Sequence, residues 1–242
     1  MTTPSSDSPR RRHDGRNRAI LALDTSTSRV IVAVGTPDGV PLGLTWWAAD
    51  HRHGEQLLPS IGRVLGEANV RRSRLEAIVA GTGPGAFTGL RVGLATAKGL
   101  AHGLGRPLVG VATSQALIDA AAAAEGIPAA RIVLLLPAGP SDRVVARVGT
   151  PARLIAGGTD VDGLRGDDVL VAVDLDGRAP IDAVERGARA RDGLGEQLLR
   201  LGAARLATHG ADDLAGLVPE YVTLPRGVAA AVGEVTWSPD PR

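Results

Sequence analysis

A glycine-rich segment between two hydrophobic stretches is the part of this chain whose residue types suggest chemistry. Residues 80–89 read AGTGPGAFTG and lead into a segment with helical periodicity. Such a loop either binds an anion on backbone N–H groups or lets two backbones approach closely, because glycine has no side chain. It is not a P-loop, since no Gly-Lys-Ser/Thr follows. Ala86 also stands where a Gly-x-Gly-x-x-Gly motif needs glycine.

A second candidate site lies between two short β-type stretches, at Asp24, Thr25, Ser26 and Thr27. In actin-like ATPases, a strand–turn–strand of the type Asp-x-Ser/Gly-Thr binds a nucleotide phosphate, and its carboxylate acts through the metal. These four residues are therefore candidate phosphate-binding residues. Asp, Ser and Thr also stabilise turns by bonding to their own backbone, so both interpretations stay open here.

Other catalytic patterns are missing from the sequence. The spacing of His51, His53 and Glu55 resembles no standard zinc site. Residues two apart on a helix point about 200° apart and cannot chelate together, whereas in an extended segment they could, but no third protein ligand is evident. Neither a Gly-x-Ser-x-Gly elbow nor a His-Glu-x-x-His motif is present, and zero cysteines exclude thiolate chemistry. We expect no catalytic residue, no metal and no cofactor of the chain's own.

Composition bounds the class of protein. The 242 residues are 44% hydrophobic and 2% aromatic, which predicts a mostly aliphatic core. Residues 1–18 carry five Arg and two Asp, so the remainder has a net charge of −2 and offers no basic nucleic-acid surface. No apolar run approaches the ~18 residues of a membrane span. We expect a cytoplasmic protein with a disordered basic tail over 1–18.

Hydrophobic patterning predicts alternating strands and helices. In the first half, we expect strands at 20–23, 30–34, 40–47, 75–80 and 107–111, and helices at 55–68 and 88–104. In the second, we expect strands at 131–136, 144–148, 153–156 and 169–173, and helices at 114–124, 181–190 and 195–208. This order predicts an α/β protein with two lobes, 19–113 and 114–222, and an extended segment over 223–242. It is typical of the two-lobed actin-like, sugar-kinase-like (ASKHA) fold with a reduced second lobe.

The predicted helix after the glycine loop carries small residues every four positions: Gly89, Gly93, Ala97, Ala101 and Gly105. They form one i±4 ridge, along which helices pack closely. Glycine inside a helix costs roughly 1 kcal/mol relative to alanine, so close packing must offset that cost. The ridge packs either against the sheet inside the chain or against a second protein.

Several segments together resemble the TsaB (YeaZ) family, which is needed to make threonylcarbamoyladenosine in tRNA. They are residues 21–27 (LALDTST), 53–59 (HGEQLLP), 83–93 (GPGAFTGLRVG), 97–101 (AKGLA) and 107–111 (PLVGV). The resemblance is dense from 19 to about 118, faint from 125 to 215, and returns weakly at Pro219, Glu220, Tyr221 and Val222.

The catalytic paralogue TsaD carries a His-x-x-x-His metal motif after the strand that follows the glycine-loop helix. Here Thr113 and Leu117 occupy those positions, and neither binds that metal. TsaD also needs a glycine-rich loop that binds adenosine, and in this sequence only Gly157 and Gly158 are candidates for it. The resemblance therefore implies a non-catalytic scaffold or activator subunit that serves modification of position 37 in ANN-decoding tRNAs.

The resemblance also implies partners. TsaB-like proteins pair with TsaD through a bundle of the two first-lobe helices, and the P-loop ATPase TsaE joins the same assembly. ATP would enter through TsaD and TsaE, and tRNA contact would be indirect. A homodimer would use the same surface and exclude TsaD. The interface residues expected on this basis are Leu57, Leu58, Ile61, Leu65, Thr88, Gly89, Arg91, Val92, Gly93, Thr96, Ala97 and Leu100.

Two other functions remain open on the sequence. A small-molecule kinase or ATPase of the actin-like class would bind ATP and lose that binding in Asp24→Ala. A metallopeptidase would lose activity with a chelator and in His53→Ala.

Overall fold

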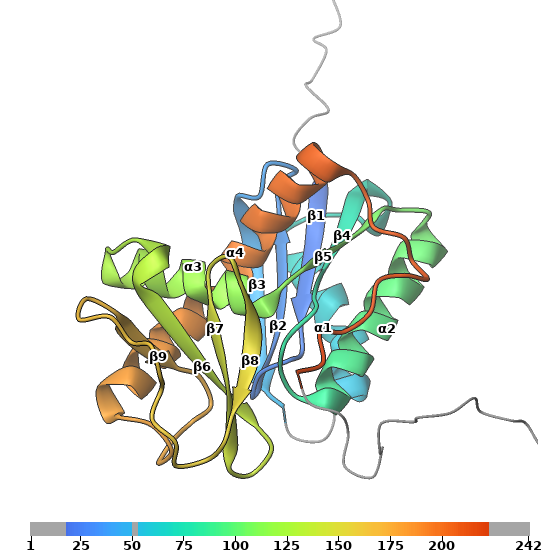
Figure 1. Ribbon diagram of the computed structural model, residues 1–242. Helices are drawn as coiled ribbons and strands as arrows, with labels where there is room; N and C mark the ends of the chain where they lie inside the picture. Colours follow the sequence, from blue (N-terminus) through green and yellow to red (C-terminus); the bar gives the residue numbers. More distant parts are fainter. Residues whose placement is uncertain (1–17, 50–52, 223–242) are drawn as a thin grey trace, which may run out of the picture.

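A computed structural model describes residues 18–49 and 53–222 (Figure 1). The expectations for residues 1–17, for His51 and for 223–242 lie outside the described residues. Within the described part, the predicted strands and most of the predicted helices are confirmed to within about three residues at their ends.

The first sheet has five strands in the order β3-β2-β1-β4-β5. Their bounds are β1 (Ala19–Asp24), β2 (Arg29–Gly35), β3 (Pro41–Ala48), β4 (Leu75–Gly81) and β5 (Leu108–Val111). The first three form an antiparallel meander, whereas β4 and β5 run parallel to β1. The sheet is therefore mixed, as predicted.

Helices cover both faces of this sheet (Figure 1). Odd-numbered side chains of β1 pack with α1 (His53–Glu67) and α2 (Phe87–Leu104), as Leu21 and Leu23 do. Even-numbered ones, Ile20 and Ala22, join a core that includes α3 (Thr113–Glu125) and α4 (Ile181–His209). Because both faces are buried, β1 must be apolar throughout rather than alternating.

The second sheet has four strands in the order β8-β7-β6-β9. The strands are β6 (Ile132–Ala138), β7 (Asp142–Arg147), β8 (Thr150–Ile155) and β9 (Val169–Ala172), and two short 3₁₀ helices, η2 (Arg72–Arg74) and η3 (Ala129–Arg131), precede β4 and β6. One face of β6 shares the large core with α3 and α4, and the other face packs with Leu175 and Ala183. The two sheets therefore share one continuous core.

One prediction was wrong: residues 181–190 and 195–208 form not two helices but the single 29-residue helix α4. Gly193 and Gly195 lie at the expected break, and glycine weakens a helix in isolation. The structure uses such glycines as contact points. A Cβ at Gly195 would lie 2.4 Å from Leu44 Cδ1, and one at Gly202 would lie 2.4 Å from Val79 Cγ2. Close packing onto the sheet offsets the weak intrinsic propensity.

Residues 211–222, here termed the C-terminal strap, cover the β5 edge of the first sheet. The Asp212 N–H donates to Leu108 O at 2.9 Å, and Asp212 Oδ2 accepts from Gly110 N at 2.7 Å. Leu217 packs on Gly110, where a Cβ would lie 2.6 Å from Leu217 Cδ1. The strap thus satisfies part of an edge that would otherwise be exposed.

In the described part of the chain, no helix has the length and apolar character needed to cross a membrane.

The ion pair between Arg147 and Asp168 in the second lobe should make the free energy of unfolding depend on pH in acid. Arg147 Nη2 donates to Asp168 Oδ2 at 2.7 Å, and the Arg165 N–H donates to the same oxygen at 2.7 Å. The hydrogen bond from Arg147 is the main cause that lowers the pKa of Asp168 to about 2. A carboxyl with a lowered folded-state pKa stabilises the fold above its unfolded pKa of about 3.9 and loses that contribution as pH falls.

We therefore expect the free energy of unfolding to fall less steeply between pH 4 and pH 2 in Asp168→Asn than in the wild type, measured by urea titration. Asp176→Asn, at an exposed aspartate, is the matched control and should keep the wild-type slope. Identical slopes for the wild type and Asp168→Asn would contradict this assignment.

Candidate functional site: the cleft between the sheets and the adjoining helix face

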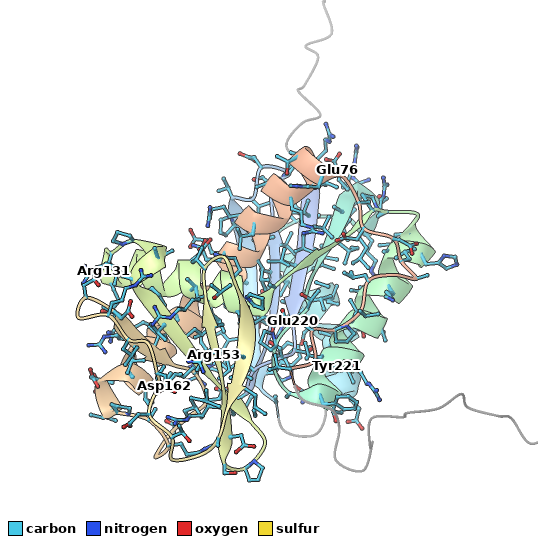
Figure 2. The ribbon with its side chains drawn as sticks, viewed as in Figure 1. Glu76, Arg131, Arg153, Asp162, Glu220 and Tyr221 are labelled. Atoms are coloured by element: carbon cyan, nitrogen blue, oxygen red, sulfur yellow. The ribbon has the colours of Figure 1, made fainter. Side chains whose placement is uncertain are left out.

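A cleft of about 820 Å³ lies between the two sheets. Four segments line it: the β1–β2 turn at 26–28, the glycine loop and start of α2 at 84–89, the β6–β7 hairpin at 137–142, and the end of the strap at 220–222. Figure 2 shows Glu220 and Tyr221 between the second sheet and α2. The cleft therefore collects the two segments that the sequence marked as candidate sites.

Asp24 is turned away from this cleft into the interior. Its side chain is fully buried. Oδ1 accepts from the Ser26 N–H at 2.8 Å and the Ser26 hydroxyl at 2.7 Å, and Oδ2 accepts from the Thr113 hydroxyl at 2.6 Å. Burial raises the pKa of the Asp24 carboxyl, while the three donors act against that rise. In this arrangement the carboxylate holds the turn.

Thr113 links three segments at the buried end of the turn. Besides donating to Asp24, its hydroxyl accepts a hydrogen bond from the Gly83 N–H at 3.0 Å. It thus joins β1, the glycine loop and the start of α3. Sequence reasoning noted only that Thr113 is no metal ligand, and it missed the structural role of this residue.

The glycine loop makes close backbone contacts with the β1–β2 turn. A Cβ at Gly85 would lie 2.3 Å from Ser26 O, one at Gly89 would lie 2.0 Å from Thr25 O, and one at Gly93 would lie 2.1 Å from Thr25 Oγ1. The Ala86 N–H donates to Ser26 O at 2.8 Å. Of the two interpretations of this loop, close approach describes what these glycines do in the structure.

The predicted phosphate-binding residues consequently separate. Ser26 and Thr27 line the cleft, whereas Asp24 and Thr25 do not. The Thr25 hydroxyl is engaged with Gly89 O at 2.7 Å. The Ser26 and Thr27 hydroxyls also make internal hydrogen bonds, to Asp24 Oδ1 at 2.7 Å and to Arg29 O at 2.9 Å. Contact with a phosphate stays a prediction for the four residues.

The charges around the cleft are acidic. Asp142, Asp174 and Glu220 line it, and no Lys or Arg is among its described lining residues. Asp174 is held by the Ser28 N–H at 2.6 Å and by Arg191. Burial raises the pKa of Glu220. An anionic ligand would therefore have to bring a cation with it. Within residues 18–49 and 53–222, no group of three or more His, Asp or Glu side chains is arranged to hold a metal.

The residues expected at a partner interface divide between the interior and the surface. Six are buried inside the chain and do not form a surface: Leu57, Ile61, Leu65, Gly89, Gly93 and Ala97. For these the expectation is corrected, because they pack on β1, β2 and β4 or on the β1–β2 turn. The residues that the structure leaves exposed or partly exposed are Leu58, Thr88, Arg91, Val92, Thr96 and Leu100.

A small aromatic cluster lies at the start of α2. The Phe87 and Tyr221 ring centroids are 5.0 Å apart. The Arg91 guanidinium lies 3.8 Å from the Phe87 centroid, and its Nε donates to the Tyr221 hydroxyl at 3.0 Å. The weak motif around Pro219 and Tyr221 was the only sequence signal for it. The cluster fixes the end of the strap on the helix that carries the predicted interface.

The fold and this cleft define a two-lobed α/β protein with a mixed sheet in each lobe. YeaZ from Pseudomonas aeruginosa aligns over 84% of this chain and 99% of its own with a TM-score of 0.65, at 24% sequence identity. That likeness establishes the fold. A family model described as TsaD, tRNA N6-adenosine threonylcarbamoyltransferase, matches residues 43–183.

The chain belongs to that family, and within it resembles TsaB (YeaZ). It is 35% identical over 106 residues to the tRNA threonylcarbamoyladenosine biosynthesis protein TsaB of Haemophilus influenzae, covering 44% of each chain. With TsaB of Escherichia coli it is 33% identical over 102 residues, which are 42% of this chain and 43% of the relative. The chain spans less than half the length of the curated relatives it matches.

Proposed function

We propose that this chain is a non-catalytic subunit in tRNA threonylcarbamoyladenosine biosynthesis that pairs with TsaD. Support for the pathway comes from the named TsaB relatives. The observation that carries the non-catalytic role is the engagement of Asp24 and Thr113 with each other, 2.6 Å apart, inside the fold. At the positions where a catalytic relative would hold a metal or phosphate, this chain makes structural hydrogen bonds.

The surface we assign to TsaD is the outer face of α1 and α2. Leu58, in α1, is 56% exposed although it is a large apolar side chain. Val92, Thr96 and Leu100 follow one another along α2 at helical spacing and are partly exposed. An apolar stripe on two helices that cover the same face of a sheet is a surface that a second pair of helices can cover. TsaE would join this assembly, ATP would enter through TsaD and TsaE, and tRNA would be reached through the complex in the cytoplasm.

Size-exclusion chromatography with light scattering, on the chain mixed with TsaD of the same organism, tests the pairing. We expect a complex with the wild-type chain, and at least about tenfold weaker binding with Leu58→Asp, because a carboxylate would be desolvated in an apolar interface. Ile181→Asp is the matched control: Ile181 is 74% exposed at the start of α4, away from α1 and α2.

Two results would count against the proposal. One is the absence of any complex between the wild-type chain and TsaD, with or without ATP. The other is equal binding by Leu58→Asp and Ile181→Asp, which would move the contact off the helix face. Threonylcarbamoyladenosine formation by TsaC, TsaD and TsaE, with and without this chain, gives the functional readout.

The alternative function, a small-molecule kinase or ATPase, depends on the cleft. Its volume of about 820 Å³ is large enough for a nucleotide. Of the three carboxylates that line it, Asp174 is paired with Arg191, so Asp142 and Glu220 are the groups that would repel a phosphate. Calorimetric titration with millimolar MgATP decides: saturable binding would favour this alternative, and its absence removes it.

A further inference from the structure

Among residues 18–49 and 53–222, no segment pairs with the outer edge of β3, unlike the opposite edge of the same sheet. β3 is the terminal strand of the order β3-β2-β1-β4-β5 and pairs only with β2 among the strands that the structure describes. Its sequence, PLGLTWWA, contains no charged residue, and its one proline, Pro41, is the first residue. Natural edges are blunted by charges, internal prolines, bulges or covering segments. None of these protects the centre of β3.

The side chains along this edge are apolar and exposed. Leu42 is 45% exposed, Leu44 40% and Trp46 50%. Alternate residues of a strand point to one face, so these three form a single stripe. At the Trp46 end of this stripe, the Arg29 guanidinium lies 4.0 Å from the Trp46 ring centroid. Arg29 is itself paired with Asp192 at 2.6 Å, so its charge is compensated there.

The register identifies which backbone groups are free. The Ala49 N–H donates to Ser28 O at 2.8 Å, next to the Arg29–Ala48 pair of the ladder. In an antiparallel ladder, hydrogen-bonded and non-hydrogen-bonded pairs alternate. Ala48, Trp46 and Leu44 therefore direct their N–H and C=O groups away from β2, toward the open edge. The free backbone groups and the exposed apolar side chains belong to the same residues.

The other exposed edges of the two sheets are treated differently. The C-terminal strap bonds to β5 through Asp212. The edge strand β8 carries Arg153, whose Nη2 donates to Asp162 O at 3.2 Å. The terminal strand β9, VLVA, is also uncharged, but its Leu170 O accepts a hydrogen bond from Arg186 Nη1 at 3.3 Å. β3 therefore differs from the other three terminal strands, and an uncharged apolar strand is the partner that matches its side chains.

We propose that β3 pairs in antiparallel fashion with β3 of a second copy of this chain, joining the two five-stranded sheets. Antiparallel pairing of one strand with itself has two-fold symmetry, which is the commonest symmetry of protein dimers. Centred on Thr45, it overlaps the whole strand and places Leu44 opposite the partner's Trp46 and Trp46 opposite the partner's Leu44. Aromatic–aliphatic cross-strand pairs of this kind stabilise sheets.

This dimer does not use the outer face of α1 and α2, and the inference stands independently of the proposed function. It also differs from the shared dimer and TsaD surface implied by the family resemblance. Two charged groups of opposite sign lie on α1 beside this edge: Arg63 Nη2 donates to Thr45 Oγ1 at 3.0 Å, and Glu55 lines the same hollow as Arg63, next to Trp46 and Trp47.

Sedimentation velocity of the full chain from about 1 to 200 μM tests the association. We expect a monomer–dimer equilibrium that is weakened at least tenfold in Leu42→Lys and in Trp46→Lys, because each puts a charge on the edge. Leu58→Lys and Ile181→Lys are matched controls at exposed apolar positions and should dimerise as the wild type does. Loss of the dimer in Leu58→Lys, or its persistence in Leu42→Lys, would overturn the proposal in favour of the helix face.

A covalent readout fixes the register. The chain has no cysteine, and the pairing places Thr45 opposite its own copy in a non-hydrogen-bonded pair, where Cα atoms lie about 4.5 Å apart and a disulfide can form. Thr45→Cys should give a disulfide-linked dimer on mild oxidation, whereas Val148→Cys, at an exposed position in the second lobe, should not.

Hydrogen exchange at the β3 amides can contradict the dimer. A chain that stays monomeric with slowly exchanging Leu44 and Trp46 amides would assign the edge to another segment of the same chain and overturn the dimer.

Discussion

Gly89→Ala is expected to destabilise the chain by about 3 kcal/mol, near the upper end of what a single added methyl group costs in a packed interior. The new Cβ would lie 2.0 Å from the carbonyl oxygen of Thr25, which is backbone and cannot rotate away. The turn that carries Thr25 is itself held by Asp24 and Thr113. Relief of the clash must therefore move α2 off β1, and urea unfolding should show a lower midpoint.

Gly99→Ala, in the same helix, is the matched control. A Cβ at Gly99 meets no atom within 4 Å. Alanine is favoured over glycine in a helix by up to about 1 kcal/mol, so this variant should be more stable than the wild type. Two variants with the same chemical change should thus shift the midpoint in opposite directions. If Gly89→Ala were as stable as Gly99→Ala, the close approach of α2 to the turn would be wrong.

Thr113→Val should cost about 3 kcal/mol at neutral pH. The change keeps the shape of the side chain but removes the donor to the buried Asp24 carboxylate and the acceptor for the Gly83 N–H. Lost hydrogen bonds to charged groups cost more than those between neutral groups, and the buried partners are left unsatisfied. Thr96→Val is the control, since its hydroxyl bonds only back to Val92 O in its own helix, and it should change stability by less than about 0.5 kcal/mol.

The loss in Thr113→Val should also depend on pH in a defined direction. Burial already raises the pKa of Asp24 above its unfolded value, and removing a donor to the charged form raises it further. Between the unfolded and folded pKa values the native state binds more protons than the unfolded state, so stability falls as pH rises. The deficit relative to the wild type should therefore be smaller at pH 4 than at pH 7. A deficit that is constant, or largest in acid, would show that Asp24 does not carry it.

Periodicity was enough to predict the strands and helices of this chain, because nearly all of them bury a regular apolar pattern. The failure at α4 has a physical cause: Gly193 and Gly195 weaken a helix in isolation, and only tertiary contacts such as that of Gly195 with Leu44 compensate. Similarly, the four-residue spacing of small residues in α2 could be read from the sequence. What this ridge packs against could not, because its contact is Thr25, more than sixty residues from Gly89 in the chain.

The candidate site was less predictable than the fold. Short polar turns such as residues 24–27 look alike whether they bind phosphate or hold themselves together, and the difference here is the hydroxyl of Thr113, 89 positions along the chain. The cluster of Phe87, Arg91 and Tyr221 was also hidden, because its members come from opposite ends of the fold.

The position of α4 in the chain has a consequence for how the protein is made on the ribosome. Ile20, Ala22, Ile31 and Ala33 of the first sheet share their core with Leu198, Leu199 and Ala203. During synthesis that face of the sheet lacks the cover that α4 provides until residues 198–203 have been made, although its strands and α3 emerge earlier. The nascent chain must therefore keep an apolar sheet face soluble for most of its translation, which is a window for chaperone binding and for aggregation. Because the sheet is synthesised before the helix that covers it, the order of synthesis sets how long the nascent chain is exposed to aggregation.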